Sequence, residues 1–380
     1  MNGRLRSESV SPSCHSRPQS KQQRRILQNR ELLLRGHDRL WPAFGPFRVT
    51  FPRLRLRRLL AWSGILISVV FTYVAVRDVD FDLVWSALRE SNYWYVAPAL
   101  AALAAGVFLR IVRWRYVFRP ESRPATGDLA HALLIGYLFN NVLPARAGEA
   151  ARVVALHQRA GASRLETVGT ITLERVFDVL SLLTLLFVAV PFLPEVTWLR
   201  RAALIAVVVV ALVLGLTIML AGFGDRPLRF VLRPLARLPR VSVDRAEQAG
   251  ANLAIGFAAI RDVKLAVVAF VLTTVSWVAL AVSAWALFFA FDLELGFGAG
   301  LLVVVTTNLV QVLPSSPGAL GVFEAATQVA LGAFGVGDSR ALSYAVVLHA
   351  LNFLPYLVVG LFVLQRHRGF LRREPQPSDA

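Results

Sequence analysis

Long apolar runs separated by short polar segments dominate the pattern of hydrophobic positions along the chain. An apolar run of about 18 residues or more is long enough to cross a bilayer as an α-helix. Runs of this kind predict spans at about 59–76, 94–111, 168–190, 202–223, 265–291 and 341–364. The pattern therefore predicts an all-α, polytopic membrane protein with about six full transmembrane helices.

Polar and helix-breaking residues interrupt two further apolar runs. The first break reads NNVLPARAGE from residue 140, and the second reads TNLVQVLPSSPGALGVFE from residue 307. Irregular backbone and charge at membrane depth are tolerated only where protein or water satisfies them, so each break is a candidate site. An entering arm of about 14 residues reaches roughly 21 Å as a helix, which is short of the ~30 Å hydrocarbon core. These lengths favour re-entrant hairpins over full crossings.

The two breaks belong to an internal repeat. A Leu-Pro pair at 143–144 recurs 170 residues later at 313–314, and a Gly at 148 recurs at 318 with the same offset. Ala-Leu-Arg at 87–89, before the second span, likewise parallels Ala-Ile-Arg at 259–261, before the fifth. Two halves, about 57–192 and 200–366, then each read span, span, broken hairpin, span. Repeats of inverted orientation with interrupted helices indicate a transporter whose site lies near the bilayer midplane; chance recurrence is the alternative.

Composition and charge support the membrane class and set the orientation. The chain is 56% hydrophobic and only 17% charged, and its formal net charge is +17. In a soluble protein that charge would suggest nucleic-acid binding. Here the Arg residues fall in loops and tails, and the positive-inside topology and the attraction of anionic lipid headgroups explain why they are there. We expect no nucleic-acid partner. The positive-inside rule predicts a multi-pass protein of the cell (plasma) membrane with both termini cytoplasmic, the first hairpin entering from the cytoplasm and the second from outside.

The predicted membrane domain spans 57–368, between a disordered basic cytoplasmic tail at 1–56 and a short cytoplasmic tail at 369–380. Residues 1–58 hold 14 Arg or Lys against three acidic residues and lack the short apolar run of a signal peptide. A misassigned start codon and a tail that grips anionic lipid are the alternatives. The single cysteine, Cys14, allows neither a disulfide framework nor a Cys-based metal site. We expect no metal and no cofactor.

Three motifs resemble a known family. NVLPARAGE at 141–149 with Arg152, ERVFD at 174–178 and PSSPGALGVFE at 314–324 resemble the integral membrane domain of lysylphosphatidylglycerol synthases and its stand-alone, flippase-like relatives. The resemblance covers about 57–368, with Ala319 standing where the family often has a second Gly. Some members carry an aminoacyl-transferase domain after the membrane part. Because this sequence stops at Ala380, the resemblance implies a member without that domain, and the expectation is that the chain is not an enzyme.

The function implied is the transbilayer translocation of an anionic or aminoacylated phospholipid, or of a polyprenyl-phosphate-linked lipid. The expected partners are that lipid and anionic headgroups, and a homo-oligomer is left open. One rival is a polyprenyl-phosphate-dependent membrane glycosyltransferase, for which Asp78, Asp80 and Asp82 outside the first span are the best support. Those residues would otherwise simply begin an interfacial helix. A second rival is a non-transporting scaffold for envelope synthesis.

A translocated headgroup needs a polar track, because an ion is costly to move into hydrocarbon. Guanidinium groups of the first break and of the third span would bind phosphate oxygens bidentately, and amide and hydroxyl groups would replace headgroup water. The residues predicted to bind substrate are Asn140, Asn141, Pro144, Arg146, Gly148, Glu149, Arg152, Glu174, Arg175, Asp178, Asn308, Gln311, Pro314, Ser315, Ser316, Pro317, Gly318, Gly321 and Glu324.

The acidic residues among them have alternative roles. Glu174 and Asp178 lie four apart on the third span, so they share a helix face. Buried carboxylates of this kind pair with Arg to fix the structure, or else couple protons or bind a cationic headgroup. Glu324 either caps a broken helix or contacts substrate.

Several residues outside the breaks also have two possible roles. Arg110 and Arg113 are cytoplasmic anchors that snorkel to the headgroups, or else phosphate ligands. His349 in the last span makes a satisfied contact between helices, or else faces the cavity. Trp94 and Trp114 are predicted to lie in the interfacial aromatic belt.

Overall fold

The computed structural model describes residues 66–143, 147–192, 263–311 and 316–366, together with the single positions 208 and 215. All of them belong to the unit Arg58–Ala380, and every regular element in these ranges is helical. The predicted tails at 1–56 and 369–380, most of the fourth span and the basic loop that follows it lie outside the described residues.

Three of the described helices are long and apolar enough to cross a membrane. They are α4 (Val96–Val117), α11 (Val263–Phe288) and α14 (Asp338–Arg366). The short helix η1 (Tyr93–Tyr95) precedes α4, and η5 (Phe289–Phe291) follows α11. The predicted third span is α7 (Arg164–Ala189), and the first span is described over Leu66–Val76. The predicted all-α polytopic class is confirmed.

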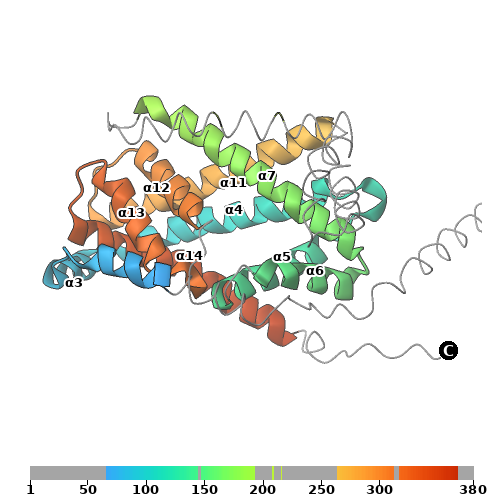
Figure 1. Cartoon of the computed structure of the whole chain (residues 1–380), viewed down its shortest axis with the longest axis horizontal. Helices are drawn as coiled ribbons and strands as arrows, with labels where there is room; N and C mark the ends of the chain where they lie inside the picture. Colours follow the sequence, from blue (N-terminus) through green and yellow to red (C-terminus); the bar gives the residue numbers. More distant parts are fainter. Residues whose placement is uncertain are drawn as a thin grey trace, which may run out of the picture. The chain divides into compact units, whose positions relative to one another are not determined.

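Each broken stretch forms a pair of helices. The first pair is α5 (Thr126–Val142) and α6 (Ala147–Ala160); the second is α12 (Phe297–Val310) and α13 (Val322–Gly332), with η6 (Pro317–Ala319) before α13. With 17 residues, α5 is the longest of the four and reaches about 25 Å, less than the ~30 Å core. The order of long helix, hairpin and long helix occurs twice (Figure 1), in agreement with the predicted repeat.

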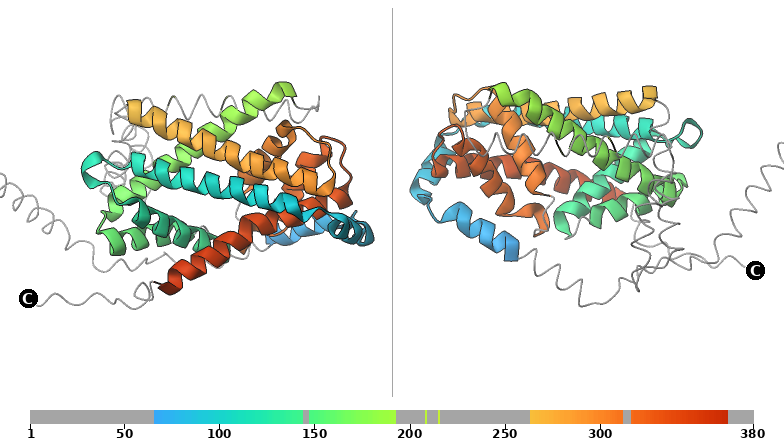
Figure 2. Two further views of the ribbon diagram at one scale, coloured as in Figure 1. Left: turned by 180° about the vertical axis from the view of Figure 1, so that it is seen from behind. Right: turned by 45° about the horizontal axis from the view of Figure 1, so that its top comes forward.

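Helices α4 and α11 occupy equivalent places in the two halves and pack side by side in opposite directions (Figure 2). At one end, Ser283 on α11 donates a hydrogen bond to the carbonyl of Ala99, at 2.8 Å. At the other end, Arg113 on α4 donates to the hydroxyl of Thr273, at 3.2 Å. Between them, a Cβ on Gly106 would lie 3.3 Å from the carbonyl of Ser276. A small residue there allows the close approach typical of membrane helices.

The predicted amphipathic segment after the first span is α3 (Phe81–Glu90). Asp80 is its N-cap, and its Oδ1 accepts hydrogen bonds from the backbone N–H groups of Asp82 and Leu83, at 2.9 and 3.3 Å. An acidic N-cap satisfies N–H groups that have no partner within the helix. Helix α3 packs against α14. The remaining short helices are η2 (Pro120–Ser122) and η3 (Val190–Phe192).

Helix α4 continues six residues beyond its predicted end at residue 111. The extension carries Arg113 and Trp114 into the packed interior, where both are 0% exposed. The prediction that Trp114 lies in an interfacial belt is therefore wrong, and Arg113 does not snorkel to headgroups. Hydropathy placed the end of the span at these polar residues because it does not register the partners, distant in sequence, that satisfy them.

Candidate functional site

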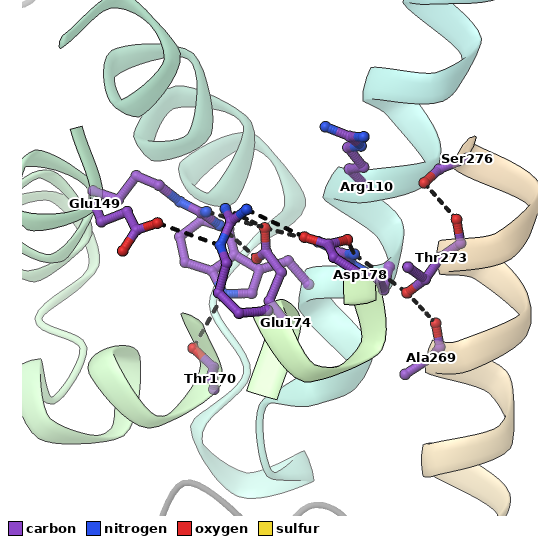
Figure 3. A network of polar contacts seen from close by, with 12 residues as sticks. Arg110, Glu149, Thr170, Glu174, Asp178, Ala269, Thr273 and Ser276 are labelled. Atoms are coloured by element: carbon purple, nitrogen blue, oxygen red, sulfur yellow. Dashed lines mark hydrogen bonds and ion pairs between the residues drawn. The ribbon is translucent and has the colours of Figure 1, made fainter. Parts of the chain in front are cut away.

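Glu174 on α7 lies at the centre of a buried ionic network (Figure 3). Its two carboxylate oxygens accept hydrogen bonds from the guanidinium of Arg152 on α6, at 3.2 and 2.9 Å. Arg113 on α4 reaches the same carboxylate, with its Nη2 2.8 Å from Oε1. This one acidic side chain therefore joins helices α4, α6 and α7.

Asp178, one turn further along α7, extends the network. Its Oδ1 accepts from Nη1 of Arg113 at 2.8 Å, and its Oδ2 lies 3.4 Å from Nη1 of Arg175. The same Nη1 of Arg113 also donates to the hydroxyl of Thr273 on α11. Because α11 belongs to the second half, the network ties the two halves of the repeat together. Of the two roles left open for Glu174 and Asp178, the pairing with Arg is present.

The network is balanced in charge and buried over most of its extent. Among the described residues it holds three guanidinium and three carboxylate groups. Arg113, Arg152 and Glu174 are 0%, 1% and 2% exposed. Arg175 and Glu149 close the network with a 3.3 Å contact, and their side chains are 40% and 31% exposed. The buried part therefore holds the helices together, and Arg175 and Glu149 form the most exposed edge of the network.

Arg152 is enclosed by neighbours that fit its shape. Its guanidinium lies 4.0 Å from the centroid of the Trp114 ring, an arrangement that stabilises a desolvated cation. The indole N–H of Trp114 donates to Thr170 on α7 at 3.1 Å. On the side of α5, a Cβ on Gly136 would collide with the aliphatic stem of Arg152, and a Cβ on Gly148 would collide with the carbonyl of Gly136. Two glycines thus bring α5 and α6 close enough to seat the guanidinium.

Residues of the two breaks meet beside α14. Asn140 accepts a hydrogen bond from the N–H of Gly148 at 2.9 Å, which joins the two helices of the first hairpin across its break. Asn141 donates to the carbonyl of Phe353 on α14 at 3.3 Å. From the second hairpin, Gly318 packs against the end of α5, where its Cβ would lie 3.8 Å from the carbonyl of Asn141. The hairpins of the two halves therefore touch at their ends.

His349 on α14 fixes the second hairpin. Its Nε2 lies 2.8 Å from the carbonyl of Gly318, and its Nδ1 lies 2.5 Å from Oε1 of Glu324. The other oxygen of Glu324 accepts from the N–H of Gly321 at 2.7 Å, so Glu324 caps the start of α13. Gly321 has φ +78° and packs against Thr72 of the first span, a position that excludes a side chain. The capping role is the one present for Glu324, and the satisfied contact is the one present for His349.

The other predicted site residues do not gather at one place in the structure. Ser316 donates its backbone N–H to Ser68 of the first span at 2.8 Å, and Pro317 begins η6 beside it. The amide nitrogen of Asn308 donates to the carbonyl of Val304 in its own helix, and Gln311 lies at the end of α12. Pro144, Arg146, Pro314 and Ser315 lie outside the described residues.

The sequence prediction missed one central member of this site. Arg113 is absent from the predicted substrate-binding set, yet it contacts both Glu174 and Asp178. The available signal was the acidic pair itself, because two carboxylates on one face of a span require compensating charge from other helices. The choice of Arg113 as that partner depends on the packing of α4 against α7 and α11.

The comparisons with known proteins agree with this architecture. A family described as "Lysylphosphatidylglycerol synthase TM region" matches residues 61–360. Glycosyltransferase AglD of Haloferax volcanii is 28% identical over 353 residues, which cover 82% of this chain and 54% of that protein. The chain therefore spans about half the length of that relative. A UPF0104 membrane protein of Methanothermobacter thermautotrophicus is 25% identical over 295 residues, 74% of this chain and 86% of that protein.

One expectation from the sequence is overturned by these relatives. We expected no enzymatic activity, but a protein named as a glycosyltransferase aligns with 82% of the chain, so that conclusion is wrong. The comparisons indicate a membrane protein connected with lipid or glycan chemistry. The family match spans both hairpins and the ionic network. This chain belongs to the lysylphosphatidylglycerol synthase TM region family.

Proposed function

We propose that the chain translocates an anionic or aminoacylated phospholipid, or a polyprenyl-phosphate-linked lipid, between the leaflets of the cell membrane. The observation that carries this proposal is the meeting of two interrupted hairpins from opposite halves of a repeat, at Asn141 and Gly318. Broken helices that meet between repeats are the arrangement in which transporters expose polar backbone to a substrate at membrane depth.

A charged headgroup needs polar groups along its path, while its acyl chains remain in lipid. The junction of the hairpins supplies side-chain amides. Gly318 and Gly321 lie there with positive φ, a conformation that favours glycine, so the backbone at these positions carries no side chain. The exposed edge of the network supplies Arg175. Its contact with Glu149, at 3.3 Å, is longer and more exposed than the contacts that Arg113 and Arg152 make with Glu174. A phosphate that replaces Glu149 as a partner of Arg175 therefore strands a less buried carboxylate than one that replaces Glu174 as the partner of Arg152.

The buried groups have a positioning role in this proposal. Both oxygens of Glu174 are occupied by Arg152 and Arg113, and a phosphate that took one of these Arg residues would strand a buried carboxylate. That costs ~3–5 kcal/mol. Arg152 and Arg113 therefore hold the helices in register, while Arg175, with Arg146 of the first break, is assigned to the headgroup.

The proposal is tested by reconstitution. The purified chain is placed in liposomes with fluorescent lipids that share acyl chains and differ in headgroup: neutral, anionic, aminoacylated and polyprenyl-phosphate-linked. Accessibility of the fluorophore to an impermeant reductant reports the movement of each lipid between leaflets. We expect faster movement than in empty vesicles for at least one phosphate-bearing lipid that carries net charge. Equal rates with and without protein across the panel contradict the proposal.

A second candidate function is glycosyl transfer from a polyprenyl-phosphate-linked sugar, and the alignment with Glycosyltransferase AglD is the observation that favours it. Of the three acidic residues named for this role, Asp80 serves as the N-cap of α3. The same reconstituted protein is incubated with a lipid-linked sugar donor and a soluble acceptor. Sugar transfer that is lost in Asp80→Ala, in a protein that moves no lipid, supports the enzyme over the translocator.

A further inference from the structure

Arg110 on α4 lies beside the ionic network but is not part of its charge balance. The three other guanidinium groups are matched by three carboxylates, whereas Arg110 forms no ion pair with a carboxylate of the described residues. Figure 3 shows Arg110 next to Asp178 with no contact drawn between them. One positive charge is therefore left over at the junction of α4, α7 and α11.

The surroundings of Arg110 hold unused hydrogen-bond donors. Its Nε and Nη2 are buried atoms without a hydrogen-bond partner among the described residues, and so is the indole Nε1 of Trp277 on α11. Trp277 is only 4% exposed, and the guanidinium of Arg110 lies 4.3 Å from its ring centroid. A buried donor without a hydrogen-bond acceptor destabilises the fold. Two unused donors on the guanidinium and one on the neighbouring indole call for a ligand that accepts hydrogen bonds and carries negative charge.

Two tyrosines complete the surroundings. Nη1 of Arg110 donates to the hydroxyl of Tyr137 on α5 at 3.3 Å, which leaves the hydroxyl hydrogen of Tyr137 available for a further acceptor. The rings of Tyr137 and Tyr356 on α14 lie 4.7 Å apart. Arg110, Tyr137 and Tyr356 are each half-buried, and Trp277 forms the closed side. The group draws on α4, α5, α11 and α14, so it lies where the two halves meet.

Snorkelling does not account for this geometry. Arg110 lies seven residues before the end of α4 at Val117, which is about 10 Å along a helix. A snorkelling side chain would extend toward that end. Instead, the guanidinium is held over Trp277 and against Tyr137.

We propose that Arg110, Trp277 and Tyr137 form a binding site for the phosphate group of a lipid, separate from the ionic network. A tetrahedral oxyanion presents acceptor oxygens to Nε and Nη2 of Arg110 in the bidentate geometry that guanidinium favours, while the indole N–H and the Tyr137 hydroxyl reach the remaining oxygens. The site takes the phosphate, and the acyl chains stay outside it. This inference rests on the proposed function only for the source of the phosphate, because binding does not require transport.

The test is equilibrium binding to the full-length chain in neutral detergent, measured by native mass spectrometry and by calorimetry. The probes are dioctanoyl phosphatidic acid, inorganic phosphate and, as a control without phosphate, dioctanoylglycerol. Arg110→Gln removes the charge and the fork geometry, and Trp277→Phe removes only the indole N–H. Arg115→Gln is the matched control, because Arg115 is an exposed Arg on the same helix. Thermal unfolding of each variant confirms that it is folded.

We expect phosphatidic acid to bind the wild-type chain, with affinity weakened about tenfold or more in Arg110→Gln and by about threefold in Trp277→Phe, and unchanged in Arg115→Gln. Stronger binding of the lipid than of inorganic phosphate identifies the lipid as the source, and the reverse assigns the site to free phosphate and overturns the lipid proposal. Equal binding of dioctanoylglycerol, or no change in Arg110→Gln, also overturns it. Translocation without Arg110-dependent binding refutes this site alone, whereas such binding without translocation refutes the proposed function alone.

Discussion

Arg152 and Glu174 form a two-pronged ion pair, with both carboxylate oxygens bound by one guanidinium at 3.2 and 2.9 Å. The pair is almost fully buried, and it connects the first hairpin to the third span. Removing one member leaves the other charge without its partner in a low-dielectric interior, and this is the costly way to break a buried pair.

We therefore expect Glu174→Gln and Arg152→Gln each to reduce the free energy of unfolding by ~3–5 kcal/mol, seen as a lower unfolding temperature in detergent. Arg159→Gln is the control, because the Arg159–Asp128 pair is exposed, with side chains 33% and 25% accessible. Such a pair contributes about 0–1 kcal/mol. The double variant Arg152→Gln/Glu174→Gln should lose less than the sum of the single variants. Strict additivity would show that the two groups do not interact.

His349 is predicted to hold the second hairpin through both of its ring nitrogens. Nε2 lies 2.8 Å from the carbonyl of Gly318, and Nδ1 lies 2.5 Å from Oε1 of Glu324. Removing either group releases the end of the hairpin. With Cys14→Ser and a reporter Ser316→Cys, we expect His349→Ala and Glu324→Ala to raise the rate of labelling by a charged maleimide about tenfold.

Asn352→Ala serves as the matched control for this labelling experiment. Asn352 lies on the same helix, and its amide nitrogen donates to Leu348 of that helix, so its removal should leave the labelling rate unchanged. An unchanged rate in both His349→Ala and Glu324→Ala would mean that the hairpin is held by other contacts.

The glycines between α5 and α6 are predicted to be required for packing. A Cβ at Gly136 collides with the stem of Arg152, and a Cβ at Gly148 collides with backbone. We expect Gly148→Ala to cost about 1–3 kcal/mol or more, as overpacking does. Gly127→Ala on α5 is the control, because nothing lies within 4 Å of that Cβ, and Ala should stabilise the helix by up to about 1 kcal/mol. Thermal unfolding distinguishes these outcomes, and an equal response of both variants would contradict the close packing.

The predicted inverted topology can be tested by sidedness. With Cys14→Ser, single cysteines at Gln158 and Ser316 probe the predicted cytoplasmic end of the first hairpin and the break of the second. An impermeant maleimide applied to intact cells should label Ser316→Cys, while Gln158→Cys should require permeabilised cells. Labelling of both from one side would rule out oppositely oriented hairpins.

The helix order could be predicted from the sequence, because spans and breaks follow from local hydropathy and from Pro and Gly. The Leu-Pro pairs at 143–144 and 313–314 mark two hairpins whose flanking helices, α5 and α12, begin at Thr126 and Phe297 in equivalent positions. The local pattern was also sufficient to predict the start of α3, because Asp is a residue type that favours the N-cap position, which Asp80 occupies.

The partners within the site could not be predicted in the same way. Glu149 and Arg152 lie three residues apart on α6, a spacing that allows a pair on one helix face, but Glu149 pairs with Arg175 and Arg152 pairs with Glu174. Arg113 was expected near the headgroups, and its carboxylate partners lie 61 and 65 residues away along the chain (174 − 113 and 178 − 113). Such pairs depend on the tertiary packing of helices, which periodicity along one helix does not report.

Translocation by this chain can be measured as the rate at which a charged, phosphate-bearing fluorescent lipid changes leaflet in proteoliposomes containing wild-type, Arg175→Gln or Arg159→Gln protein. Both substitutions remove one Arg from a partly exposed ion pair that involves the first hairpin. Only Arg175 belongs to the ionic network, where it also contacts Asp178 at 3.4 Å. We expect rapid translocation by the wild type and by Arg159→Gln, and a rate about tenfold lower for Arg175→Gln because a charge-assisted contact is lost. A wild-type rate equal to that of empty vesicles would contradict translocation itself, and an unchanged rate in Arg175→Gln would contradict the assignment of the headgroup to Arg175.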